Sequence, residues 1–105
     1  MSTLSNMIEE IKQEIADGAE LEELRDNSGE WVDGYLPVYH NRIIDEWKEM
    51  PSEYDNRGAA ELGGDAVIDI IHLMTLDLYL YYSDLWHEAL SDVESELEGA
   101  SNEAN

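Results

Sequence analysis

The feature that most constrains the fold is a stretch from Asp65 to Glu98 that contains neither proline nor glycine. An apolar residue recurs there at every third or fourth position, which is the spacing of one face of an α-helix. The residues that keep this spacing are Val67, Ile71, Met74, Leu78, Tyr82, Leu85, Ala89, Val93 and Leu97. The stretch therefore predicts one long helix. At about 1.5 Å per residue it would extend roughly 50 Å, which is longer than a globule of this size is wide, so we expect an elongated molecule.

Shorter helical segments precede this stretch. A first amphipathic helix, which Gly18 can end, is indicated by Leu4, Met7, Ile8, Ile11 and Ile15. A brief helix is expected over Leu21–Arg25. Between Glu30 and Met50 the spacing is helical again, and Pro37 predicts a kink or a split there because proline lacks an amide donor. The apolar residues of this middle segment are Trp31, Tyr35, Tyr39, Ile43, Trp47 and Met50.

The remaining segments predict connections. Residues 51–64 contain a proline and several glycines, which is typical of a loop, and residues 99–105 predict a disordered polar tail. No alternating run is long enough to predict a strand. The expected fold is therefore all-α, with a short N-terminal helix, a kinked middle helix and a long acidic C-terminal helix in a single domain over residues 1–98.

The charge limits the partners. The chain carries 26 Asp and Glu residues against 5 Lys and Arg, a formal net charge of −21. Anionic lipid surfaces and nucleic acids attract proteins through Lys and Arg, so we expect no direct binding to either and a basic surface as the partner. The hydrophobic share of 43 % is that of an ordinary globular protein, so the chain should still fold. The N-terminus has no secretory signal pattern and the chain has no cysteine, so no oxidising compartment is expected.

The acidic residues are unevenly placed. All five Lys and Arg precede residue 58, so the long helix has no cation of its own. Like charges four residues apart destabilise a helix, and anions near its C-terminus oppose the helix dipole, so this layout favours a role other than folding. The predicted partner-binding carboxylates are Asp69, Asp77, Asp84, Glu88, Asp92, Glu94, Glu96 and Glu98, together with Asp45, Glu46 and Glu49 of the middle segment.

The spacing of these carboxylates suggests what they imitate. Four residues of helix rise about 6 Å, which is close to the distance between successive phosphates along a nucleic-acid strand. With one duplex charge per about 1.7 Å, a charge of −21 corresponds to roughly 36 Å of B-DNA, or about ten base pairs. Two chains would match about twenty base pairs. The layout predicts a protein imitation of a phosphate ladder.

Several short strings add a family resemblance. These strings are Leu24-Arg25-Asp26, Pro37-Val38-Tyr39 followed by Ile43 and Ile44, Val67-Ile68, and Asp84-Leu85-Trp86 with Ala89. In them the chain resembles the phage anti-restriction DNA mimics of the Ocr ("overcome classical restriction") type. The resemblance implies an acidic helical homodimer, active in the cytoplasm of the infected host, that fills the DNA groove of type I restriction-modification enzymes. CRISPR and other defence systems are further targets for the same charge mimicry.

Other interpretations remain open. The chain could be an acidic helical adaptor that docks on a basic protein without imitating nucleic acid, or a protein adapted to high salt. Tyr79 and Trp86 are candidates for a dimer interface, and the equal alternative is that their face covers the first helix of the same chain. The pairs Asp69–His72 and Asp84–His87 have the spacing of metal ligands on a helix. Histidines in such positions are nevertheless more often ordinary surface or core residues, and we expect that here. We expect no metal, no cofactor and no enzymatic activity.

Overall fold

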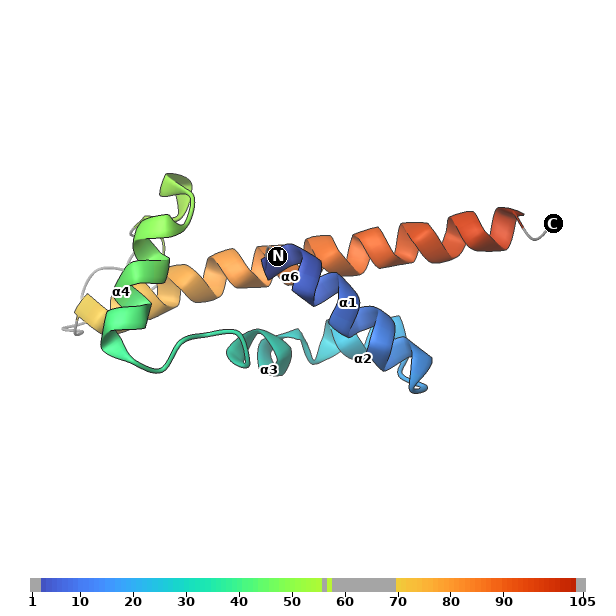
Figure 1. Cartoon of the computed structure of the whole chain (residues 1–105), viewed down its shortest axis with the longest axis horizontal. Coiled ribbons are helices and arrows are strands. Elements are labelled where there is room, and N and C mark those ends of the chain that lie inside the picture. The colour runs from blue at the N-terminus through green and yellow to red at the C-terminus, as the bar shows by residue number, and fades with distance from the viewer. Residues whose placement is uncertain (1–2, 56, 58–69, 104–105) are drawn as a thin grey trace. The chain divides into compact units, whose positions relative to one another are not determined.

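The computed structural model describes residues 3–55, 57 and 70–103, and within them the chain is all-α, as predicted (Figure 1). No strand occurs in these residues. The elements are α1 (Thr3–Ala16), α2 (Leu21–Asp26), α3 (Ser28–Asp33), α4 (His40–Glu49), the 3-10 helix η1 (Ser52–Tyr54) and α6 (Ile70–Glu103).

The chain forms two compact units. The terminal unit comprises residues 1–31 and 84–105, and the central unit comprises residues 32–83. The 34-residue helix α6 contributes its first part to the central unit and its second part to the terminal unit. The predicted single domain over residues 1–98 stays a prediction.

In the terminal unit, α1 ends where the sequence predicts. Gly18 has a φ of 108°, a left-handed conformation that glycine adopts without steric cost. The Gly18 amide donates to the Ile15 carbonyl at 3.0 Å, and the Ala19 amide donates to the Glu14 carbonyl at 2.9 Å. This is the Schellman arrangement, which satisfies the last carbonyls of a helix. The chain then turns into α2, which contacts α1.

The core of the terminal unit is centred on Trp86. This side chain has no exposed surface, its ring stacks on Trp31 with centroids 5.6 Å apart, and its indole N–H donates to the Leu24 carbonyl at 3.1 Å. Around it lie the buried side chains of Met7, Ile11, Leu24, Ala89, Leu90 and Val93. The prediction of Trp86 as a dimer contact is therefore wrong for this structure, because its own chain covers the ring.

In the central unit the middle segment is split, as Pro37 predicts. α3 ends at Asp33 and α4 begins at His40, since proline cannot donate the amide hydrogen bond that a continuous helix needs. Among the described residues of this unit, the buried apolar ones are Val32, Ile43, Met50, Tyr54, Leu78 and Tyr82. Tyr82, which keeps the apolar spacing of the predicted long helix, is one of these buried residues.

The ends of the long helix differ from the prediction. Its predicted start at Asp65 lies outside the described residues, which resume at Ile70. At the other end α6 continues to Glu103, so the helix does not stop at Glu98 and the predicted polar tail is helical as far as Glu103. A glycine such as Gly99 destabilises a helix by about 1 kcal/mol relative to alanine. It does not end the helix here, because glycine can adopt helical φ and ψ values. Glycine ends a helix when it takes a positive φ, as Gly18 does.

Trp86→Phe tests the place of this residue. The change leaves the Leu24 carbonyl without its buried donor, so we expect the free energy of unfolding to fall by about 1 to 3 kcal/mol in urea titrations. Tyr39→Phe, at a side chain that is 69 % exposed, should change it by less than about 0.5 kcal/mol. If Trp86→Phe leaves stability unchanged and alters the sedimentation coefficient, the residue belongs to a subunit interface instead.

Candidate functional site

The negative charge is concentrated in the terminal unit. That unit contains 16 acidic and two basic residues, a net charge of −14, whereas the central unit contains ten acidic and three basic residues, a net charge of −7. The two values sum to the −21 of the chain. A cationic partner is therefore attracted most strongly to the terminal unit.

One face of α6 carries a regular series of carboxylates in this unit. Asp84, Glu88, Asp92 and Glu96 follow one another at four-residue steps, and all four side chains are exposed. The opposite face is buried in the core around Trp86. A step of four residues rises about 6 Å, so the series, called the acidic row below, spans about 18 Å. Glu98 is exposed close to the end of the row.

Two cations from the N-terminal helices reach α6, and the spacing of residues in the sequence does not predict these contacts. Lys12 Nζ lies 2.7 Å from Glu96 Oε2, and Arg25 Nη2 lies 3.0 Å from Glu94 Oε2. These side chains are roughly half exposed, so each pair contributes at most about 1 kcal/mol to stability. The long helix carries no Lys or Arg of its own, as the sequence shows, and Glu94 and Glu96 are paired with cations of α1 and α2.

Asp77 was predicted as a partner-binding carboxylate, and that prediction is wrong. Its side chain is 2 % exposed, and its Oδ2 accepts a hydrogen bond from the Trp47 indole N–H at 2.9 Å. The sequence contained a signal for this, since Asp77 lies three residues after Met74 and next to Leu78, on the apolar face of the helix. Asp77 joins α6 to α4 within the central unit.

Glu46 is likewise engaged inside the central unit. Its carboxylate accepts a hydrogen bond from the Tyr82 hydroxyl, and Arg42 Nη2 lies 3.5 Å away. Burial, together with the hydrogen bond to Glu46, raises the pKa of the Tyr82 hydroxyl above its ordinary value. The Glu46 side chain is 22 % exposed, and its predicted part in partner binding stays a prediction.

The other predicted residues divide as follows. Asp45 and Glu49 are exposed on α4, whereas Asp69 lies outside the described residues. Tyr79 is partly exposed, and its predicted place in a dimer interface stays a prediction. The site that the structure brings together is therefore the acidic row, with Glu94 and Glu98 beside it.

The described residues contain no group of three or more His, Asp and Glu side chains placed to hold a metal ion. Of the pairs with metal-ligand spacing, Asp84 and His87 are both exposed, and Asp69–His72 includes an aspartate outside the described part. None of the described helices has the length and apolarity of a membrane-spanning segment.

Comparison of the chain with protein-family models, with curated proteins and with solved structures finds no match. The likeness to the Ocr-type mimics therefore stays a resemblance of short strings.

The Tyr82–Glu46 contact predicts a loss of stability in alkali. Because the native pKa of Tyr82 is raised, its contribution to stability is complete below the unfolded value of about 10 and declines as the pH rises above it. The unfolding free energy of Tyr82→Phe should fall less steeply between about pH 10 and pH 12 than that of the wild type. Glu46→Gln, which keeps an acceptor and removes the charge, should reduce the slope in part. Equal slopes for all three proteins would contradict the assignment.

Proposed function

We propose that this protein is a DNA mimic that occupies the DNA-binding groove of a bacterial defence enzyme and blocks entry of the substrate. Type I restriction-modification enzymes are the first candidates, and CRISPR effectors are the second. The observation that supports the proposal is the acidic row, a series of exposed carboxylates at regular steps on the most negative unit of the chain.

The spacing of the row fits a groove that binds phosphates. Successive carboxylates rise about 6 Å along α6, and the exposed Glu98 widens the negative face, whereas Glu94 is paired with Arg25. Lys and Arg side chains that contact consecutive phosphates of DNA can contact these carboxylates in the same order. No base edges are imitated, so the mimic competes for the part of DNA binding that is independent of sequence.

The energetics of folding do not favour the row. Each pair of like charges four residues apart destabilises the helix by a few tenths of a kcal/mol. Lys12 compensates for Glu96 at one end of the row. A surface selected only for solubility would mix the two signs of charge, so binding to a cationic partner is the better explanation.

The mechanism requires no chemical step. The opposite fields of the two proteins accelerate their encounter, and salt slows it by screening. Each exposed carboxylate contributes little by itself, so inhibition depends on several of them together. A homodimer would present about twice the length of negative surface, which corresponds to about twenty base pairs.

A competition assay tests the proposal. A fluorescent duplex of about twenty base pairs is bound to the methyltransferase core of a type I enzyme, and this protein is then added in increasing amounts. A parallel assay uses a Cas9-type effector in place of the type I enzyme. We expect displacement of the duplex that weakens as salt is added. Binding without displacement would support the acidic adaptor, and absence of binding to every enzyme tested would contradict the proposal. Unfolding of the free protein in dilute buffer would favour adaptation to high salt.

Neutralising the row should weaken inhibition. In the combined variant Asp84→Asn, Glu88→Gln and Asp92→Asn, we expect a loss of affinity of roughly tenfold to a hundredfold and a weaker salt dependence. Thermal unfolding should show a more stable fold, because the like-charge pairs are removed.

The matched control removes the same number of charges from exposed positions of the central unit, with Asp33→Asn, Glu53→Gln and Asp55→Asn. It should retain most of the inhibition. Equal losses in the two combined variants would mean that net charge alone attracts the partner and that the acidic row has no special part.

A further inference from the structure

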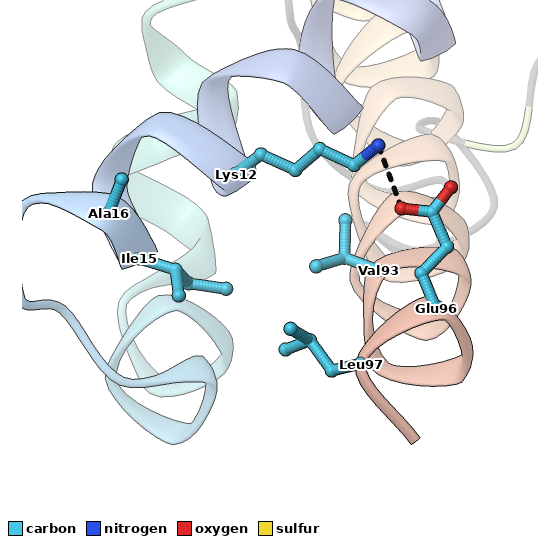
Figure 2. A pocket seen from close by; sticks show the side chains of 6 residues that line it. All are labelled: Lys12, Ile15, Ala16, Val93, Glu96 and Leu97. Atoms are coloured by element: carbon cyan, nitrogen blue, oxygen red, sulfur yellow. Dashed lines mark ion pairs between the residues drawn. The ribbon is translucent and has the colours of Figure 1, made fainter. Parts of the chain in front are cut away.

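The terminal unit contains an open apolar pocket next to the acidic row. Its volume is about 280 Å³, and it is lined by Lys12, Ile15 and Ala16 of α1 and by Val93, Glu96 and Leu97 of α6. In Figure 2 the side chains of Ile15 and Leu97 point toward one another from the two helices, and the Lys12–Glu96 ion pair lies at one edge. The volume is close to the lower limit of about 300 Å³ for small-ligand sites.

The pocket leaves apolar surface open to water. Leu97 is 46 % exposed, although its place in the apolar rhythm of the helix predicts a core residue. Val93, one turn earlier, is buried. When another apolar group covers a half-exposed leucine, burial of the apolar surface stabilises the complex by about 1 kcal/mol or more.

The surrounding charge determines which apolar group suits the pocket. Glu96 belongs both to the pocket and to the acidic row, Glu98 is exposed nearby, and the one cation of the lining, Lys12, is paired with Glu96. A second copy of the chain would bring another unit of net charge −14, and a fatty acid would bring a carboxylate, so both are repelled. An apolar side chain between cationic neighbours is attracted.

We propose that this pocket binds an apolar side chain, such as leucine or methionine, that is flanked by Lys or Arg on the surface of the target protein. The inference rests on the proposed function in one respect, which is that the target is a basic protein. DNA offers no counterpart to this contact. The pocket therefore gives the inhibitor an attachment that salt does not screen, and it slows dissociation after the charges have guided encounter.

Two fluorescent peptides test the pocket without the target enzyme. Both have three Lys or Arg residues on each side of a central residue, which is leucine in one and serine in the other. By fluorescence anisotropy we expect the wild-type protein to bind the leucine peptide about fivefold more tightly, since part of the leucine side chain is buried. The ratio should persist at high salt, while both affinities decline.

Variants of the lining show where the preference arises. Leu97→Gln removes the open apolar wall without adding charge, and Ala16→Leu fills the pocket from the other helix. In both variants we expect the leucine and serine peptides to bind about equally, with the affinity for the serine peptide unchanged. Val38→Gln removes an apolar side chain that is 79 % exposed in the central unit and should keep the preference. Circular dichroism verifies that each variant folds.

Each outcome bears on a separate claim. A wild-type protein that does not distinguish the peptides overturns the inference, and so does a preference that survives both pocket variants. If Leu97→Gln instead changes the sedimentation coefficient, the pocket is a contact between copies of this chain. A clear preference in a protein that does not compete with duplex DNA would support the pocket and contradict the DNA mimicry.

Discussion

The structure depends on the burial of one side of α6 against the N-terminal helices, with Trp86 at the centre. The terminal unit contains about half of the residues of the chain and has a net charge of −14. Repulsion among its carboxylates therefore opposes the packing of its helices. The apolar contacts around Trp86, its stacking on Trp31 and its hydrogen bond to the Leu24 carbonyl offset that repulsion. Without this core, no burial of apolar surface would offset the repulsion, and the helices would not associate.

The same core gives the acidic row its orientation. A helix has one buried and one solvated face, so fixing Trp86 and Val93 inside directs Asp84, Glu88 and Asp92 to the solvent. The pairs Lys12–Glu96 and Arg25–Glu94 connect α6 to α1 and α2 at the edges of that face. The core, the row and the open pocket are therefore consequences of a single packing arrangement.

The central unit uses its acids differently. Asp77 accepts the Trp47 indole N–H, and Glu46 accepts the Tyr82 hydroxyl, so two carboxylates with the same sequence appearance as the row hold α4 against α6. A carboxylate beside a tryptophan or tyrosine donor is stabilised by that hydrogen bond. In a chain of 26 acidic residues, low exposure beside such a donor distinguishes Asp77 and Glu46 from the exposed carboxylates of the row.

The sequence by itself determined the helices, because helical periodicity, Gly18 and Pro37 act through local backbone geometry. It also determined the charge and the four-residue spacing of Asp84, Glu88 and Asp92, since helical faces follow from spacing alone. Only the tertiary structure decided that the chain itself covers Trp86, that Asp77 accepts the Trp47 indole N–H, and that Lys12 and Arg25 reach α6. These outcomes depend on contacts between residues more than 25 positions apart in the chain, and local spacing carries no information about which distant side chain covers a given face.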